Sequence, residues 1–155
     1  VAVTGVRRVL FRSCRCTPDS IARYQGKISG PLLDRIDMLV PVAALSAEDM
    51  LQSATGEPSS AIAARVQQAR EVQQQRQHKT NAALSAGELD SLCAPDDSTQ
   101  SLLRSAMERL QWSARAYHRV LRLARTIADL DHCARVAASH VSEAIQYRRA
   151  LAAPQ

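Results

Sequence analysis

The sequence predicts a mainly α-helical protein, a small helical bundle attached to the edge of an α/β core of which one helix and one strand are present. Two observations predict this fold class. Apolar residues make up 46% of the chain but aromatic residues only 3%, so the core must be built from Leu, Val, Ile and Ala. Helical spacing of apolar residues prevails from about residue 59 onward, whereas a single short run is typical of a strand.

The first expected elements are a short helix and a short strand. Thr17 offers a hydroxyl at the N-cap, Pro18 suits the first helical position, and Asp19 places an acid in the first turn. A helix should therefore run to about Lys27. The run DMLVPV, residues 37–42, is typical of a strand that ends or lies at an edge. Because one strand cannot form a sheet, we expect its partners in sequence upstream of this chain.

A linker and a long polar helix are expected next. Residues 46–60 are rich in Ser, Ala, Glu, Thr, Gly and Pro, which is typical of a linker or flexible loop. Over residues 59–78 the apolar residues form only a narrow helical stripe, so this helix should project from the bundle or lie on its surface. The stripe contains Ile62, Val66, Ala69 and either Val72 or Gln73.

The remaining helices each begin at a recognisable N-cap. These caps are Ser85 in a capping box with Glu88, one of residues 96–98, Ser113 and Ser139. Core-facing spacing follows the second cap at Leu102, Leu103, Ala106, Met107 and Leu110 and the fourth at Val141, Ala144, Ile145 and Arg148. We also expect Cys93 and Cys133 to be small core residues.

The charge and the apolar runs limit the class of protein. The formal charge is +5, but the run VTGVRRVLFRS resembles the translation of a sequencing-library adapter, so residues 1–13 are expected to be a non-native leader. Setting its three arginines aside lowers the charge to +2, an ordinary surface balance. No apolar run approaches the roughly 20 residues of a membrane span. Four cysteines without a disulfide framework fit a reducing cytoplasm.

The segment SARAYHRVLRLARTIADL has the most two-sided helical pattern in the chain. At about 100° per residue its apolar residues gather on one side and its arginines on the other. The arginines are Arg115, Arg119, Arg122 and Arg125. Two interpretations stay open: a solvated helix face, or an anion site at Arg115, which lies in the first turn, where free N–H groups and the helix dipole favour phosphate.

Three further residues are candidates for a site. Arg35 lies between Asp34 and Asp37, where it either pairs with an aspartate and reaches water or serves a ligand. Cys14 and Cys16 are separated by one residue, so they are either half of a tetrathiolate zinc site or two free thiols.

The histidines have no metal-ligand spacing and should be exposed or hydrogen-bonded; they are His78, His118, His132 and His140.

Several segments, in order, resemble the C-terminal part of the magnesium-chelatase-like AAA+ ATPases of the YifB/ComM competence-protein family. They are CRCTPDSIARYQGKISGPLLDRIDMLVPV, SSAIAARVQQAREVQQQR, NAALSAGELDSLC, LQWSARAYHRVLRLARTIADL and HVSEAIQYR. The resemblance covers residues 14–149. It implies that residues 14–45 are a remnant of the ATPase core with its arginine-finger helix and last strand. Residues 46–60 would then be the linker, and residues 61–155 the C-terminal helical lid domain.

The resemblance implies a bacterial, cytoplasmic ATPase that forms a homo-oligomeric ring, a hexamer, with ATP and Mg²⁺ between subunits. The position of Arg35 matches a catalytic arginine finger that reaches the nucleotide of a neighbouring subunit, held by its flanking aspartates. The position of Arg115 matches sensor 2, which binds the nucleotide. A planar, permanently charged fork suits both roles because it can hold two phosphate oxygens. Many family members carry a CPCG stretch upstream, which implies possible Zn²⁺ at Cys14 and Cys16.

The sequence also departs from the family pattern. It contains no GxxxxGK[ST] phosphate loop and no apolar run ending in paired acids, so this fragment is not expected to hydrolyse ATP by itself. The family is linked to branch migration of DNA during natural transformation, which implies DNA as a partner. Two alternatives stay open: the ATPase subunit of a magnesium chelatase, and a non-enzymatic helical adaptor that binds nucleic acid.

Overall fold

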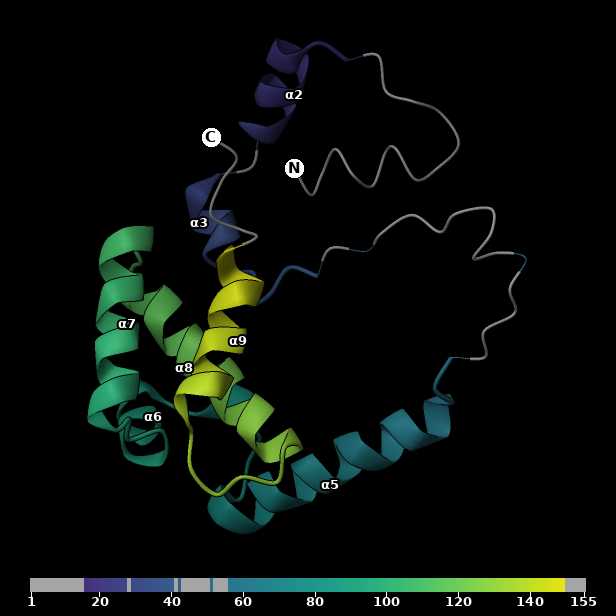
Figure 1. Cartoon of the computed structure of the whole chain (residues 1–155), viewed down its shortest axis with the longest axis vertical. Helices are drawn as coiled ribbons and strands as arrows, with labels where there is room; N and C mark the ends of the chain where they lie inside the picture. Colours follow the sequence, from purple (N-terminus) through teal and green to yellow (C-terminus); the bar gives the residue numbers. More distant parts are fainter. Residues whose placement is uncertain (1–15, 28, 41, 43–50, 52–55, 150–155) are drawn as a thin grey trace.

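The computed structural model describes residues 16–27, 29–40, 42, 51 and 56–149. This part of the chain is mainly α-helical (Figure 1), which confirms the predicted fold class. The helices are α2 Pro18–Gln25, α3 Gly30–Leu33, α5 Ser59–Gln77, α6 Ala86–Leu92, α7 Asp97–Leu110, α8 Ala114–Leu130 and α9 Ala138–Arg149, with a 3-10 turn, η1, at Asn81–Ala83.

The strand expected at residues 37–42 is not formed in the described part of that run. Residues 37–40 have no regular secondary structure. The backbone N–H of Leu39 instead donates to the carbonyl of Tyr147, near the end of α9, at 3.1 Å. The last carbonyls of a helix have no partner within the helix, so they can accept from a segment that lacks a neighbouring strand.

Local capping explains where most of the helices begin. The Thr17 hydroxyl accepts from the backbone of α2, Asp96 accepts from Thr99 at 2.8 Å, and Ser113 accepts from Ala116 at 3.2 Å. Ser85 and Glu88 form the predicted capping box. These hydrogen bonds satisfy N–H groups that the first turn of a helix leaves unpaired.

The last N-cap prediction is wrong. Helix α9 begins at Ala138, so Ser139 lies inside its first turn. Ala137 immediately precedes the helix, and its backbone N–H donates to Nδ1 of the buried His140 ring at 3.0 Å. Nε2 of His140 lies 3.4 Å from the Asp131 carboxylate. His140 is therefore a hydrogen-bonded histidine, as predicted.

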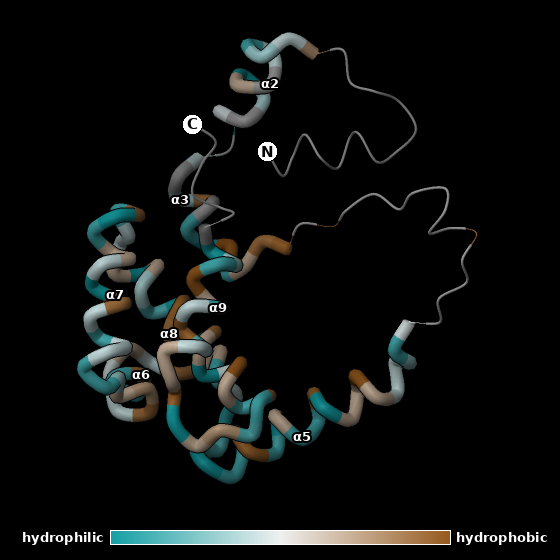
Figure 2. The backbone as a smooth tube through the Cα atoms, viewed as in Figure 1, coloured by the Kyte–Doolittle hydropathy of each residue, from teal (hydrophilic) through white to brown (hydrophobic). Residues whose placement is uncertain are grey.

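Helix α8 lies at the centre of the bundle. It packs against α5, α6, α9 and η1, while α7 packs against α9. Hydrophobic residues gather where these helices meet, and hydrophilic residues lie mainly outside (Figure 2). The predicted apolar face is confirmed, because its central residues are at most 1% exposed; they are Val120, Leu121, Ala124 and Ala128. Facing residues complete this core, among them Leu84, Leu89, Cys93, Leu103, Val141 and Ala144.

Helix α5 projects from the bundle along much of its length (Figure 1). Only Ala69 and Gln73 of its predicted apolar stripe are buried, near the end that contacts α8. Ile62, Val66 and Val72 are each at least 40% exposed. The expectation of a projecting or surface helix is therefore confirmed.

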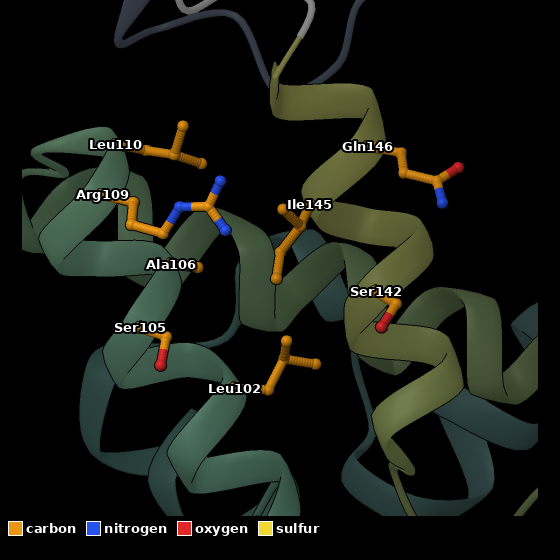
Figure 3. Close-up of a pocket in the computed structure, with 8 residues that line it drawn as sticks. All are labelled: Leu102, Ser105, Ala106, Arg109, Leu110, Ser142, Ile145 and Gln146. Atoms are coloured by element: carbon orange, nitrogen blue, oxygen red, sulfur yellow. The ribbon is translucent and has the colours of Figure 1, made fainter.

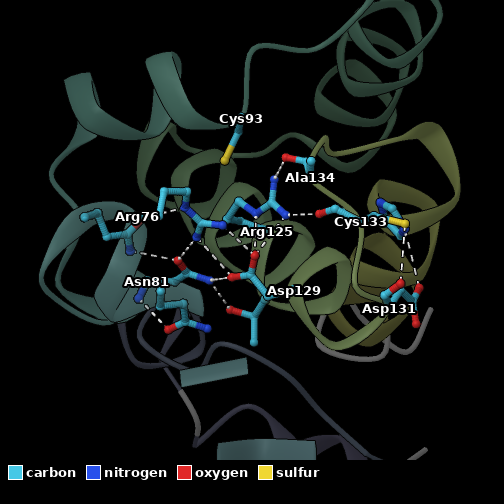
Figure 4. Close-up of polar contacts among 12 residues, drawn as sticks. Arg76, Asn81, Cys93, Arg125, Asp129, Asp131, Cys133 and Ala134 are labelled. Carbon is cyan, nitrogen blue, oxygen red and sulfur yellow. Dashed lines mark hydrogen bonds and ion pairs between the residues drawn. The ribbon is translucent and has the colours of Figure 1, made fainter. Parts of the chain in front are cut away.

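Asp129 is the centre of a buried polar network at the C-terminal end of α8 (Figure 4). Both terminal nitrogens of Arg76 donate to its carboxylate, at 2.6 and 3.1 Å, and Asn81 donates at 2.8 Å. Arg125, which is 1% exposed, donates to the same carboxylate through Nε at 3.1 Å. Its other two nitrogens donate to the carbonyls of Cys133 and Ala134. The network therefore ties the end of α5 to α8 and to the turn before α9.

The paired arginines change the acidity of Asp129. Burial by itself would raise the pKa of its carboxyl group. Hydrogen bonds from Arg76 and Asn81, together with the charges of Arg125 and Arg76, outweigh burial and hold this pKa below its ordinary value. Asp129 therefore stabilises the fold in its ionised form.

The two cysteines expected in the core have different environments. Cys93 is buried, and its Sγ lies 3.7 Å from the Leu121 carbonyl. Burial raises the pKa of this thiol to about 11, so it stays protonated and inert at neutral pH. Cys133 is exposed, and that prediction is wrong. It lies in the turn that presents its carbonyl to Arg125, so its backbone has the structural role.

No helix in the described ranges has both the length and the apolar character that crossing a membrane requires.

Removal of the Leu121 side chain should destabilise the chain strongly. Leu121 is 1% exposed between α8 and its neighbours, so Leu121→Ala should lower the free energy of unfolding by roughly 2–5 kcal/mol. Urea unfolding followed by circular dichroism measures this change. The matched control is Leu32→Ala on α3, where the side chain is 49% exposed and the change should stay within about 1 kcal/mol. Equal losses in both variants would contradict the assigned core.

Asp129→Asn should change the pH dependence of stability. Because the folded pKa lies below the ordinary value, the carboxylate's contribution is complete above about pH 4 and is lost as the pH falls through the folded pKa. The variant cannot ionise and leaves two arginines unmatched, so it should lose roughly 3–5 kcal/mol at neutral pH. Its stability should also fall less steeply in acid, as measured by urea unfolding from neutral pH to about pH 2. Asp90→Asn, an exposed change, should keep the wild-type pH profile.

Candidate functional site

Arg115 lies at the start of α8, beside the helix cap. The Ser113 hydroxyl accepts from Ala116, which fixes where the helix begins. Arg115 follows in the first turn, and its side chain is exposed. Within the described residues it forms no ion pair. The guanidinium group of Arg115, the free N–H groups of the first turn and the positive end of the helix dipole all attract anions to this end of α8.

The other three arginines of α8 do not form the solvated face that was one interpretation of the sequence. Arg119 forms an ion pair with Asp37. Arg122 donates through two nitrogens to the Leu84 carbonyl, at 3.2 and 2.7 Å. Arg125 is buried in the Asp129 network. Three of the four guanidinium groups therefore hold other segments of the chain, and Arg115 differs from them in facing solvent.

Arg35 lies in the turn that follows α3, and its side chain is exposed. Its backbone N–H donates to the Leu32 carbonyl at 3.0 Å. The expectation that Asp34 and Asp37 hold this arginine is wrong. Asp34 pairs with Arg148, and Asp37 pairs with Arg119. The aspartates thus bind arginines of α8 and α9, which can reach them from the bundle, and leave Arg35 exposed.

Arg148 was expected only at a core-facing position of the last helix, and its contacts with the segment around Arg35 were not predicted. It is 4% exposed, and it donates to the Ile36 carbonyl at 2.6 Å and to the Asp34 carboxylate at 3.1 Å. Burial lowers the pKa of Arg148, and the charge of Arg119 acts in the same direction, while Asp34 and Asp37 oppose it. The signal in the sequence was an arginine at a core-facing position of the last helix, where a charge requires a partner.

Asp34 connects the turn that carries Arg35 with the start of α8, which carries Arg115. One of its carboxylate oxygens binds Arg148, and the other accepts from the Ser113 hydroxyl at 3.1 Å. Asp34 precedes Arg35 by one residue, and Ser113 precedes Arg115 by two. The turn that carries Arg35 therefore lies beside the start of α8, the end of the helix that carries Arg115.

The predicted zinc half-site cannot be built from the described residues. Cys14 lies outside them, and Cys16 is exposed just before α2. No group of three or more His, Cys, Asp or Glu side chains gathers as a metal site in the part of the chain that the structure describes. We therefore place neither Zn²⁺ nor Mg²⁺ on these residues, and zinc binding at Cys14 and Cys16 stays a prediction.

A cavity of about 320 Å³ lies between α7 and α9 (Figure 3). Leu102, Leu110 and Ile145 supply its apolar lining, while Arg109 extends across it from α7. Neither Arg35 nor Arg115 lines this cavity. It is therefore separate from the site built by the two exposed arginines.

Two family models match the chain. The model described as magnesium chelatase, subunit ChlI C-terminal, matches residues 56–148, which include every helix from α5 through most of α9. The model described as magnesium chelatase, subunit ChlI, matches residues 3–50. The second match overlaps much of residues 1–13, which lie outside the described residues, and the non-native leader expected there stays a prediction.

Individual relatives match nearly the whole chain. Competence protein ComM of Haemophilus influenzae is 37% identical over 135 residues, which is 86% of this chain and 26% of that protein. YifB of Escherichia coli is 38% identical over 136 residues, 86% of this chain and 27% of its own length. A protein of Mycobacterium bovis is 35% identical over 142 residues, 89% of this chain and 28% of its own.

The chain spans about a quarter of the length of the curated relatives that it matches. The matches to both family models and to these relatives agree with the resemblance found in the sequence. The chain belongs to the magnesium-chelatase-like YifB/ComM family.

Proposed function

We propose that this chain is the part of a ring-forming AAA+ ATPase that senses nucleotide and stimulates its hydrolysis. Arg115 serves as the sensor of bound ATP, and Arg35 as the arginine finger for the nucleotide of a neighbouring subunit. The rest of the protein, at the length of the relatives, supplies the phosphate loop and the Mg²⁺ ligands. This assembly is a homo-oligomeric ring, a hexamer, in the bacterial cytoplasm.

One observation supports this proposal most directly. Arg119, Arg122 and Arg125 each hold another segment of the chain, whereas Arg115 and Arg35 are exposed and form no ion pair among the described residues. An exposed guanidinium beside a helix N-terminus and a second one on the adjacent turn offer two planar, permanently charged forks. Each fork can donate two hydrogen bonds to phosphate oxygens that reach it from outside the described part of the chain.

The chemistry follows from where charge develops during phosphoryl transfer. Negative charge spreads over the oxygens of the transferred phosphoryl group, and a positioned arginine stabilises it more in the transition state than in bound ATP. Arg35 would therefore act mainly on turnover. Arg115, at the positive end of α8, would contact the phosphates already in the ground state and so contribute to binding as well.

We further propose that the motor acts on DNA, as in branch migration during natural competence. The name of the Haemophilus influenzae relative, a competence protein, supports a role in competence, and the resemblance found in the sequence links this family to branch migration of DNA. A second candidate is the ATPase subunit of a magnesium chelatase, which is supported by the description of the two matched models. The two candidates share the nucleotide chemistry of Arg35 and Arg115, and they differ in the macromolecule that stimulates it.

Arg35→Ala should abolish ATP turnover while leaving nucleotide affinity nearly unchanged. The variant is made in a protein of the relatives' full length that carries this chain. Loss of a trans-acting finger should lower kcat by about 10³-fold or more, measured as phosphate release, with the Kd of a non-hydrolysable ATP analogue within about twofold. A matched weakening of nucleotide binding would contradict a role across the subunit interface.

Arg115→Ala should weaken both nucleotide binding and turnover, because this arginine contacts the phosphates before and during transfer. The same two assays apply. Arg104→Ala, which removes another exposed arginine from α7, is the matched control and should behave as wild type. If the Arg104 and Arg115 variants lose affinity equally, general surface charge rather than a sensor explains the effect.

Addition of DNA should stimulate ATP turnover of the full-length ring several-fold if the motor acts on DNA. The stimulation should weaken as the salt concentration rises, because binding to phosphates releases counterions. Stimulation by a porphyrin-bearing chelatase partner, with no response to DNA, would instead support the second candidate.

A further inference from the structure

Arg148 binds the residues on both sides of Arg35. Its Nη1 donates to the carbonyl of Ile36 at 2.6 Å, and its Nη2 donates to the carboxylate of Asp34 at 3.1 Å. Arg35 lies between these two residues in the sequence. A single buried guanidinium therefore holds the short stretch of backbone that carries Arg35, while the Arg35 side chain remains exposed.

Asp34 extends this connection to α8. Its second oxygen accepts from the Ser113 hydroxyl at 3.1 Å, and the same hydroxyl accepts from the backbone of Ala116 at 3.2 Å. A hydroxyl has one donor and two acceptor sites, so both contacts can exist together. The chain Arg148, Asp34, Ser113 thus runs from α9 to the cap of the helix turn that contains Arg115.

Two more contacts hold the same segment. Asp37 pairs with Arg119 of α8, and the Leu39 N–H donates to the Tyr147 carbonyl of α9 at 3.1 Å. The stretch from Asp34 to Leu39 is therefore attached to both central helices. Its position relative to α8 is set by side chains that are distant in the sequence and not by a regular element.

We propose that Arg148 and Asp34 are positioning residues that hold Arg35 in a defined place relative to Arg115. This inference rests on the nucleotide roles proposed for those two arginines. We call Arg148 and Asp34 the clamp. It keeps the finger from moving independently of the sensor, so the relative positions of the two arginines are set before either meets a phosphate. Misplacement of a catalytic group by about 1 Å can cost roughly 100-fold in rate, which makes such a clamp effective without any contact between Arg148 and nucleotide.

The choice of arginine at position 148 supports this role over simple packing. Arg148 is only 4% exposed, so removing its charge from water costs free energy. An apolar residue of similar size could pack α9 without this desolvation cost. The planar fork of arginine can reach a carboxylate and a carbonyl at once, as it does here. Lysine keeps the charge but lacks this geometry.

The test measures kcat and nucleotide affinity in the full-length protein. Asp34→Asn keeps the size of the side chain and removes its charge, and Arg148→Lys keeps the charge and removes the fork. Each should lower kcat roughly 10- to 100-fold, as phosphate release, while the Kd of a non-hydrolysable ATP analogue stays within about twofold. Circular dichroism confirms folding. Arg122→Lys is the matched control, because Arg122 also donates two hydrogen bonds to a carbonyl, that of Leu84, and it should retain wild-type kcat.

A double-mutant cycle separates positioning from general stability. Each clamp variant is combined with Arg35→Lys, which weakens the finger but leaves measurable turnover. If the clamp acts through Arg35, the double variants should lose much less than the product of the single losses. Three results would overturn the inference: full multiplicative loss in the double variants, wild-type kcat in both clamp variants, or an equal loss in Arg122→Lys. A low kcat in Arg35→Ala would still support the finger in each of these cases. Wild-type kcat in Arg35→Ala would overturn the proposed function, and the clamp with it.

Discussion

Burial of one face of α8 is the constraint on which the rest of the described structure depends. Once its apolar side is covered by α9, α6 and η1, the arginines along its other side cannot all remain in open water, because neighbouring segments approach them. A partly buried guanidinium requires acceptors. Arg119, Arg122 and Arg125 obtain them from Asp37, the Leu84 carbonyl and Asp129, so the polar side of the helix becomes a row of attachment points.

The two ends of α8 therefore differ in the partners of their arginines. At its C-terminal end the Asp129 network joins α5 and the turn before α9 and contributes stability (Figure 4). At its N-terminal end the Ser113 hydroxyl binds both the helix backbone and Asp34, and the nearby Arg115 and Arg35 are exposed. Structural arginines and candidate functional arginines thus occur on one helix, and they differ in whether the chain itself supplies an acceptor.

The function proposed above explains why the two ends of α8 differ in this way. An arginine whose acceptor is missing from the described part of the chain can take one from a ligand or a neighbouring subunit, and a ring ATPase supplies both. The chain spans about a quarter of its relatives, so the acceptor would come from the larger protein. The clamp formed by Arg148 and Asp34 would prepare the chain for that contact before assembly.

The sequence alone determined the features that depend on neighbours along the chain. Caps at Thr17, Ser85 and Ser113 and the apolar face of α8 follow from hydrogen bonds and spacing within a few residues. Tertiary structure decided the rest. The pairing of Asp34 with Arg148 joins residues 114 positions apart, and together with the pairing of Asp37 with Arg119 it takes away the aspartate support expected for Arg35. Local patterns show that a charge is present, but only the fold shows which partner is close enough to neutralise it.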